Sequence, residues 1–154
     1  MSKPVVGKKI ADFSLESTAG DWRLQDAAGG KLVLYFYPRD NTSGCTREGE
    51  AFRDLHAEFR KAKTTVLGVS TDSMASHLKF KAKYGFPFEL LSDPEQAACK
   101  LFDVIKMKSM YGKKYLGVER STFLLDGKGV LRGEWRKVKV DGHAGEVLAA
   151  VRSL

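Results

Sequence analysis

The residues with the clearest chemical potential lie in one short segment, where a cysteine follows an apolar run and a polar turn. Cys45 stands near the start of an amphipathic stretch, just after the run that ends at Tyr37 and Pro38. A thiol at the start of a helix faces unpaired backbone N–H groups and the positive end of the helix dipole. This environment favours thiolate, the nucleophilic form of cysteine. The sequence therefore predicts a reactive centre at Cys45, against the simpler interpretation of a small buried hydrophobic residue.

The elements that hold this cysteine follow from the apolar residues around it. Lys31–Tyr37 is a continuous apolar run, typical of a strand buried on both faces, and Thr64–Ser70 is a second one. Between them, from Gly44 on, helical spacing predicts one amphipathic helix whose apolar residues are Phe52, Leu55, Phe59 and Ala62. Cys45 thus lies at a strand-to-helix junction.

The rest of the chain alternates between strand and helix patterns. Phe13–Glu16 and Trp22–Leu24 flank a turn-rich stretch and predict an N-terminal hairpin. A helix capped by Asp72 or Ser73 is expected to reach Tyr84 and to end at Gly85, and a strand follows over Phe86–Leu91. Asp93-Pro94-Glu95 predicts the start of a second helix, whose buried residues are Ala98, Leu101, Phe102 and Ile105. A hairpin of Ser121–Leu125 and Val130–Trp135 and a closing helix over Gly145–Val151 complete the expected elements.

This order predicts one domain over residues 1–154. Strands separated by helices pair in parallel through right-handed crossovers, and the late hairpin adds antiparallel strands. The expected fold is an α/β, thioredoxin-like three-layer sandwich with a central mixed sheet and an N-terminal hairpin. Sites in such sheets form beyond the carboxyl ends of the strands, and Cys45 lies just past the end of Lys31–Tyr37.

Composition excludes several classes of protein. The chain has 154 residues, 43% of them apolar and 29% charged, as in an ordinary soluble domain. No apolar run approaches the roughly 20 residues of a membrane span, and no apolar leader begins the chain, so we expect a cytoplasmic protein that does not enter membranes. Two cysteines form no disulfide scaffold and no zinc-binding pattern, so we expect neither a metal nor another cofactor.

The basic balance of the chain is the one compositional feature that suggests a nucleic-acid partner. The net charge is +7, and Lys106–Lys114 is a local basic cluster. The expected interpretation is a solvated loop or helix end. Aromatic residues interleaved with basic ones for base stacking are not evident, so we expect no nucleic-acid partner.

The segment around Cys45 carries a recognisable signature. Pro38, Thr42 and Cys45 form the pattern P-x-x-x-T-x-x-C, which resembles the active-site signature of the peroxiredoxins. The surrounding sequence looks most like the bacterioferritin-comigratory-protein (PrxQ) branch. The resemblance continues through ADFSL, GVSTDS, FELLSDPE, ERSTFLLDGKG and WRKVKVDGHAGEVL. It implies a thiol-dependent peroxidase that reduces hydrogen peroxide and organic hydroperoxides.

The resemblance also implies roles for the residues of the signature. Cys45 corresponds to the peroxidatic cysteine, whose thiolate attacks one peroxide oxygen. Thr42 corresponds to the hydroxyl that binds peroxide and thiolate, although it also stands where a helix cap is expected. Pro38 shields the site from water. Arg120, in ERSTF, matches the family's arginine, which stabilises negative charge at the sulfur and the leaving oxygen; its alternative is a surface ion pair.

Three supporting residues are implied in the same way. Glu48 matches the carboxylate that orients the arginine, and its alternative is a first-turn carboxylate favoured by the helix dipole. Tyr37 and Gly44 are expected to line the pocket with the backbone N–H of Cys45.

The chain departs from the family at the resolving cysteine. Many PrxQ-type proteins carry it five residues after the peroxidatic one, where this chain has Glu50, and the helix that offers the second known position (SHLKFKAKYGF) has no cysteine. Cys99 is the remaining internal thiol, and we interpret it as an inert buried residue. We therefore expect a one-cysteine-like variant, whose sulfenic acid is reduced by an external thiol such as thioredoxin, glutaredoxin or glutathione, and we expect a monomer.

Other functions compete with peroxide reduction. The main alternative is a peroxide-sensing redox protein or chaperone that uses the same cysteine. A thioredoxin-like disulfide reductase is disfavoured, because Cys45 is followed by Thr46, Arg47 and Glu48 and no C-x-x-C motif exists.

Overall fold

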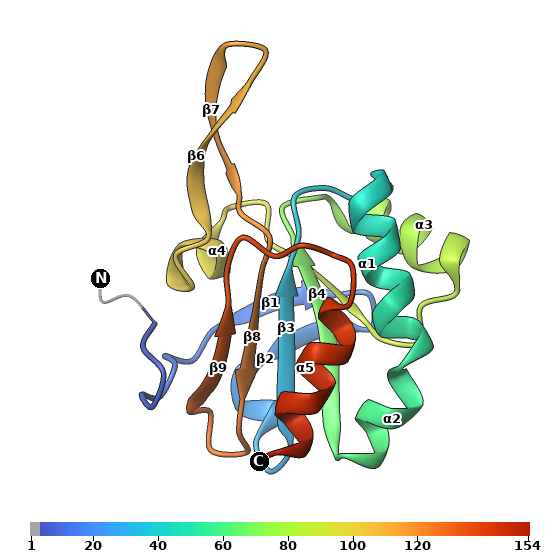
Figure 1. Ribbon diagram of the computed structural model, residues 1–154, viewed down its shortest axis with the longest axis vertical. Helices are drawn as coiled ribbons and strands as arrows, with labels where there is room; N and C mark the ends of the chain where they lie inside the picture. Colours follow the sequence, from blue (N-terminus) through green and yellow to red (C-terminus); the bar gives the residue numbers. More distant parts are fainter. Residues whose placement is uncertain (1–3) are drawn as a thin grey trace.

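A seven-stranded mixed sheet organises the computed structural model, which describes residues 4–154 (Figure 1). The strand order is β2-β1-β5-β4-β3-β8-β9. Central strand β3 (Lys31–Phe36) pairs in parallel with β4 (Thr64–Ser70) and antiparallel with β8 (Ser121–Leu125). Outward from these, β5 (Leu90–Ser92) is parallel to β4, and β9 (Leu131–Trp135) is antiparallel to β8. The predicted mixed sheet with late antiparallel strands is confirmed.

Strand β3 is apolar throughout because it separates two cores. Its side chains alternate between the faces of the sheet, as in any strand. Leu32, Leu34 and Phe36 belong to the core on one face. Val33 and Tyr35 belong to the core on the other, together with Tyr37 just after the strand. Both sets are fully buried, which explains the lack of a polar position in this run.

Helices complete the outer layers (Figure 1). The core containing Tyr35 and Cys45 is closed by apolar residues of α1 (Ser43–Asp54), α2 (His56–Lys61), α3 (Met74–Tyr84) and α5 (His143–Arg152). The opposite core is closed by α4 (Ala97–Leu101) and the short 3-10 turn η1 (Leu24–Ala27). The predicted three layers are therefore present, with most of the helical cover on the Cys45 side.

The helix predicted after Gly44 is broken into two. Helix α1 ends at Asp54 and α2 begins at His56, with Leu55 between them at φ −101° and ψ 4°. Both Phe52 and Phe59 are fully buried. The change of direction at Leu55 thus keeps the apolar residues of both segments against the sheet, whereas the spacing alone predicted one continuous helix.

The helix predicted to start at Asp93-Pro94-Glu95 begins later. Helix α4 starts at Ala97, after Gln96 adopts a left-handed conformation with φ 62°. Asp93 accepts a hydrogen bond at Oδ2 from the backbone N–H of Cys99, at 2.8 Å. The acid therefore satisfies a donor of the helix from a turn before it, and Ile105, predicted on this helix, lies instead in a strand.

Three other predictions near the sheet edge are confirmed with shifted bounds. The N-terminal hairpin consists of β1 (Ser14–Ser17) and β2 (Gly20–Arg23), and β1 also pairs antiparallel with β5. The strand predicted over Phe86–Leu91 is β5 and begins only at Leu90. Helix α3 is capped by Ser73, whose Oγ accepts from the N–H of Ser76, and ends at the left-handed Gly85.

The basic cluster Lys106–Lys114 is neither a loop nor a helix end. It forms most of a separate two-stranded antiparallel ribbon of β6 (Ile105–Met110) and β7 (Lys113–Val118). The turn is Tyr111-Gly112, with φ 51° and 77°. Two consecutive positive φ values are the geometry of the tight turns that match strand twist, which is the physical reason for a hairpin at this point.

Across residues 4–154, no helix is long and apolar enough to cross a membrane.

Two glycines on helices give opposite predictions for the same substitution. A Cβ on Gly49 in α1 lies 2.4 Å from Cζ of Phe86, whereas a Cβ on Gly145 in α5 meets nothing within 4 Å. We expect Gly49→Ala to lower the free energy of unfolding by about 1–3 kcal/mol, because overpacking outweighs helix propensity. Gly145→Ala, the control, raises it by about 0.5–1 kcal/mol. Urea denaturation measures both, and stabilisation by Gly49→Ala contradicts this packing.

Candidate active site

Cys45 lies where the chain leaves the central strand and enters α1. It is the third residue of this helix, and its side chain is 1% exposed. The helix opens with a hydrogen bond from the N–H of Thr46 to the carbonyl of Thr42, at 2.9 Å. A buried sulfur at this position faces the amino end of a twelve-residue helix. The predicted placement beyond the carboxyl end of β3 is therefore confirmed.

A single guanidinium joins Cys45 to Glu48. Arg120 donates from Nη2 toward Sγ of Cys45 at 3.4 Å and from Nη1 to Oε1 of Glu48 at 2.6 Å. The two acceptors are three residues apart on α1 and so share one face of the helix. The backbone carbonyl of Arg120 accepts from the N–H of Val138 at 3.0 Å, which holds the arginine just before β8. The structure thus brings together Cys45, Arg120 and Glu48.

Burial controls the charge on Glu48. Its side chain is 1% exposed, and Oε2 is buried with no hydrogen-bond partner. Burial raises the pKa of Glu48 to about 7, although the charge and hydrogen bond of Arg120 act in the opposite direction. Burial lowers the pKa of Arg120, but the charges at Glu48 and Cys45 outweigh it and raise that pKa above its ordinary value. The arginine is therefore the fixed charge of the site, and the glutamate is the group that titrates near neutrality.

Gly44 leaves room for the guanidinium. A Cβ at this position lies 3.1 Å from Nη2 of Arg120, closer than an ordinary van der Waals contact. The glycine is therefore required by the approach of a side chain, and its predicted place beside the site is consistent with this contact.

Thr42 and Pro38 flank the cysteine on the chain. Thr42 is exposed, and its hydroxyl donates to the carbonyl of Arg39 at 3.1 Å, so its lone pairs remain available as acceptors. It occupies the N-cap position of α1, but its side chain makes no capping hydrogen bond. Pro38 is half-buried at the end of β3. Both residues lie on the loop between β3 and α1.

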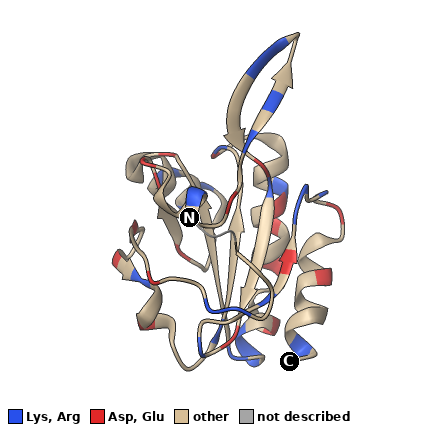
Figure 2. Cartoon of the chain, turned by 90° about the vertical axis from the view of Figure 1, so that its left-hand side faces the viewer, with Lys and Arg blue, Asp and Glu red and all other residues tan. Residues whose placement is uncertain are grey.

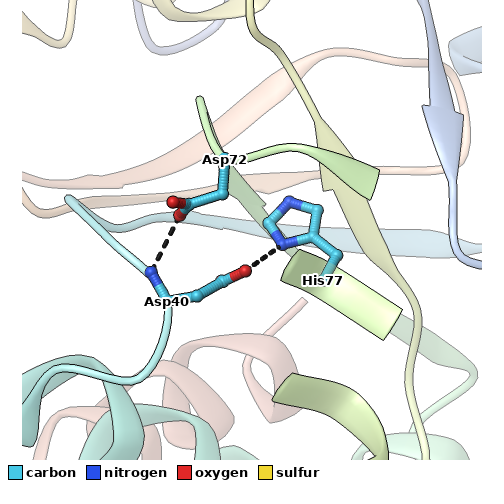
Figure 3. A group of neighbouring side chains, drawn as sticks. All are labelled: Asp40, Asp72 and His77. Atoms are coloured by element: carbon cyan, nitrogen blue, oxygen red, sulfur yellow. Dashed lines mark hydrogen bonds and ion pairs between the residues drawn. The ribbon is translucent and has the colours of Figure 1, made fainter. Parts of the chain in front are cut away.

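Tyr37 contributes to a buried polar network that anchors this loop; Figure 3 shows three members of this network, Asp40, Asp72 and His77. Its hydroxyl donates to Oδ1 of Asp40 at 2.6 Å. Oδ2 of Asp40 accepts from Ser76 at 2.8 Å and faces Nδ1 of His77 at 2.7 Å. The other ring nitrogen of His77 lies 2.9 Å from the carbonyl of Leu91, so Nε2 is the donor there. Asp40 therefore ties the loop to α3 and, through His77, to β5.

Asp72 extends the network to strand β4. Its Oδ2 accepts from the backbone N–H of Asp40 at 2.8 Å and from Ser70 Oγ at 2.6 Å. Asp40, Asp72 and His77 place potential metal-ligand atoms within 4.8 Å of one another. Each of these side chains is already hydrogen-bonded to protein groups, so the cluster fits a structural network better than an ion site.

Sequence reasoning missed this network. Asp40 and His77 are 37 residues apart, on segments that no local spacing connects. The available signal was a cluster of short polar residues in GVSTDS directly after an apolar strand, close in type to the polar turn after β3. Such a pair of polar turns at neighbouring parallel strands predicts contact at one edge of the sheet.

Cys99 is remote from the site. It is fully buried in α4, within the core on the other face of the sheet from Cys45. Burial raises the pKa of its thiol well above the ordinary value, and the charge and hydrogen bond of Asp93 add to this effect. Cys99 therefore has the environment of an inert thiol, and the sheet lies between it and Cys45.

Comparison with known families and proteins places these features in context. The profile of the AhpC/TSA family matches residues 6–134. Peroxiredoxin Bcp of Xanthomonas campestris pv. campestris is 57% identical over 130 residues, which cover 84% of this chain and 81% of that protein. Peroxiredoxin Bcp of Bacillus subtilis is 46% identical over 150 residues, which cover 97% of this chain and 96% of that protein.

Solved structures agree with the sequence comparison. Peroxiredoxin Q of Xanthomonas campestris superimposes with a TM-score of 0.88 at 54% identity, over 92% of this chain and 90% of that chain. A mutant PrxQ of Xylella fastidiosa gives a TM-score of 0.93 at 43% identity, over 99% and 98%. A further structure, of the bacterioferritin comigratory protein of Xanthomonas campestris with a TM-score of 0.88 at 53% identity over 92% and 90%, was described for its alkyl peroxide reduction activity. The predicted thioredoxin-like fold is confirmed.

The contact at Gly44 predicts a selective loss of activity. Gly44→Ala displaces the guanidinium of Arg120 by a few tenths of an ångström or more, because the added methyl lies 3.1 Å from Nη2. We expect the second-order rate of Cys45 oxidation by peroxide to fall by about tenfold to a hundredfold, since catalysis is sensitive to small misplacements. Stopped-flow tryptophan fluorescence measures this rate. Ser43→Ala, an exposed neighbour, is the control, and equal rates for both variants contradict the steric role.

The raised pKa of Glu48 predicts a pH dependence of stability. Between the ordinary value of 4.5 and about 7, the folded protein retains a proton at Glu48 that the unfolded chain releases. The contribution of Glu48 to stability is therefore present below pH 4.5 and is lost as pH rises to about 7, by on the order of 3 kcal/mol.

Glu48→Gln removes this pH-dependent loss of stability, because glutamine does not ionise. We expect the free energy of unfolding, measured in urea at several pH values under reducing conditions, to fall less between pH 4.5 and 7 in the variant than in the wild type. Parallel curves for the two proteins show that Glu48 is ionised throughout and contradict the prediction.

Proposed function

The chain belongs to the AhpC/TSA family and, within it, to the peroxiredoxins of the Bcp or PrxQ type, and from this premise we propose which of its residues perform the reaction. It is a thiol-dependent peroxidase. The observation that carries the assignment of the site is the position of one guanidinium, 3.4 Å from Cys45 Sγ and 2.6 Å from Glu48 Oε1.

Cys45 is the peroxidatic residue in this proposal. Its thiolate attacks the nearer oxygen of the hydroperoxide, the S–O bond forms, and the O–O bond breaks. The departing oxygen takes a proton and leaves as water or an alcohol, while Cys45 becomes a sulfenic acid. Arg120 stabilises the negative charge as it moves from the sulfur to the departing oxygen. Relatives described as reducing alkyl peroxides support organic hydroperoxides as substrates besides hydrogen peroxide.

The surrounding residues position these groups. Thr42 offers hydroxyl lone pairs to the hydrogen of the peroxide, and Pro38 keeps water from the sulfur. Glu48 orients Arg120, and Gly44 gives the guanidinium its space beside the sulfur. Tyr37 acts indirectly, because its hydroxyl is bonded to Asp40 at the base of the loop.

The sulfenic acid is reduced by a thiol from another molecule in this proposal. Glu50 stands at the common position of the resolving cysteine, and Cys99 lies in the core on the opposite face of the sheet. Thioredoxin, glutaredoxin and glutathione are the candidate reductants. In this proposal the protein is a monomer, and these reductants act on it in the cytoplasm. No metal or cofactor takes part in these steps. The sensor or chaperone alternative is not favoured, since the relatives are peroxiredoxins with peroxide reduction activity.

The two cysteines are expected to respond differently to the same substitution. Cys45→Ser abolishes peroxide turnover with dithiothreitol as reductant, because serine is not ionised at the site and is a far weaker nucleophile. Cys99→Ser is the matched control and retains turnover within about twofold, although it loses some stability through the buried position. Consumption of hydrogen peroxide and of cumene hydroperoxide measures both.

Mass spectrometry of the wild type after one equivalent of peroxide separates the two mechanisms. We expect a sulfenic acid at Cys45, trapped with dimedone, and a free thiol at Cys99. An intramolecular Cys45–Cys99 disulfide, or turnover retained by Cys45→Ser, overturns the assignment.

A further inference from the structure

The ribbon of β6 and β7 stands apart from the rest of the fold. Its strands pair only with each other among the residues described, and it projects beyond the sheet at the end where α1 begins (Figure 1). A two-stranded ribbon on its own is marginally stable in water. Its second strand ends at Val118, and two residues later the chain reaches Arg120. The ribbon is therefore attached directly to the catalytic arginine.

The register gives the ribbon two different faces. Met107 is paired with Leu116, and these side chains are 62% and 64% exposed. Lys108 is paired with Tyr115, one residue further along, and therefore lies on the opposite face. Met110 and Lys113 form the next pair on that face. One face is thus centred on exposed apolar residues and the other on lysines.

The lysine face is directed toward the catalytic site. The stem of Lys108 lies over Gly117, where a Cβ is 3.3 Å from Lys108 Cδ. Burial and the charge of Arg120 lower the pKa of Lys108, while the charges of Cys45 and Glu119 act in the opposite direction. The ammonium group of Lys108 is therefore within electrostatic range of the guanidinium and the sulfur.

Protection of the strand edges explains only part of this composition. Lysines on exposed strands prevent edge-to-edge aggregation, so the positive charges alone do not indicate a binding partner. Protection gives no reason for apolar exposure, however, and the ribbon exposes Met107 and Leu116 at mid-length and Tyr111, 98% exposed, at the turn. Exposed apolar residues rimmed by charge are typical of an interaction surface.

We propose that this ribbon docks the protein that reduces oxidised Cys45, a dithiol protein whose contact surface is apolar at its centre and acidic at its rim. The inference rests on the proposed function, since it assigns a surface to the external reductant. Lys113 and Met110, a cross-strand pair on the face that carries Lys108, are the contact residues that it singles out, one for charge and one, 56% exposed, for apolar contact.

Charge favours an acidic partner over a second copy of this chain. Residues 105–118 include four lysines and no acidic residue, and no acidic residue marks the projecting part of the ribbon in Figure 2. The chain as a whole has a net charge of +7. Two copies meeting through their ribbons therefore repel, whereas an acidic surface is attracted and steered toward the site.

The position of the site favours a protein over a lipid surface. Six residues of a strand extend about 17–20 Å, and Arg120 follows the base of the ribbon rather than its turn. If a membrane bound the turn at the tip of the ribbon, Cys45 at the base would lie well away from the membrane surface. A protein that lies along the lysine face contacts the exposed Met110 and Tyr115 and still reaches the base with a thiol.

The docked protein completes the cycle in two thiol exchanges. Its first thiolate attacks the sulfur of the Cys45 sulfenic acid, the S–S bond forms, and the S–O bond breaks with release of water after the oxygen takes a proton. Its second thiolate then attacks the partner sulfur of this mixed disulfide. Cys45 leaves as thiolate, and the partner leaves oxidised to an internal disulfide.

The test compares protein and small-molecule reductants of one variant. The full chain with Lys113→Glu and Met110→Ser is assayed with thioredoxin kept reduced by its reductase, with glutaredoxin kept reduced by glutathione, and with dithiothreitol. We expect kcat/KM for the better protein reductant to fall at least about tenfold, the size of one interface hot spot, with the dithiothreitol rate unchanged. Added salt lowers the wild-type rate with the protein reductant and leaves the dithiothreitol rate unchanged.

Matched substitutions away from the ribbon give the control. Lys128→Glu with Leu78→Ser replaces a lysine at the β8–β9 turn and an exposed apolar residue on α3, where Leu78 is 50% exposed, and we expect all three rates to be retained. The proposal is overturned if kcat/KM falls equally with every reductant, or if it does not fall with the protein reductants. It is also overturned if neither protein gives the wild type a higher rate than dithiothreitol does. So does ribbon-dependent binding to phosphatidylglycerol vesicles, or self-association lost in the variant, when the protein rates are unchanged. Failure of the proposed function differs from all of these, because the wild type then shows no turnover with dithiothreitol.

Discussion

A positive charge held largely out of water is the constraint around which the catalytic end of this molecule is arranged. The side chain of Arg120 is 16% exposed, and a guanidinium in that position requires negative partners within hydrogen-bond distance. Glu48 supplies one such partner, but its burial raises its pKa and so disfavours its charged form. The sulfur of Cys45 is therefore the second group that accepts from the guanidinium and offsets its charge. In the proposed reaction, the thiolate of Cys45 is therefore both the nucleophile and a second counter-ion of this guanidinium.

The central sheet separates the two cysteines into different environments. Cys45 and Cys99 are both fully buried, so exposure alone does not distinguish them. The difference lies in their neighbours: one sulfur has an arginine beside it, and the other has Asp93, whose charge opposes ionisation. Because β3 separates the cores that contain them, Cys99 does not lie beside Cys45, which supports the proposed reduction by a thiol from another molecule.

The sequence predicts elements and candidate site residues where these residues are close along the chain or where their burial leaves a continuous pattern. Pro38, Thr42 and Cys45 form one segment, and the strand before them is apolar because both of its faces are covered. Arg120 lies 75 residues from Cys45, and no spacing rule connects them, so only the family resemblance identified it.

The errors have physical causes of the same kind. The Asp40–His77 contact depends on tertiary packing, which leaves no local pattern. The ribbon was missed because its lysines alternate with apolar residues along β6 and stand together at the start of β7, so that neither face shows the pattern of a buried strand face. The late start of α4 reflects a left-handed Gln96 that no propensity indicates.

The hydrogen bonds of Asp40 have a consequence for how the molecule opens. They join the loop after β3 to α3 and β4, and His77 extends the connection to β5. These bonds are strong only while the group stays dry, because water competes for every donor once it enters. We therefore expect this end of the sheet to open as one cooperative unit, with its amides exchanging with solvent together.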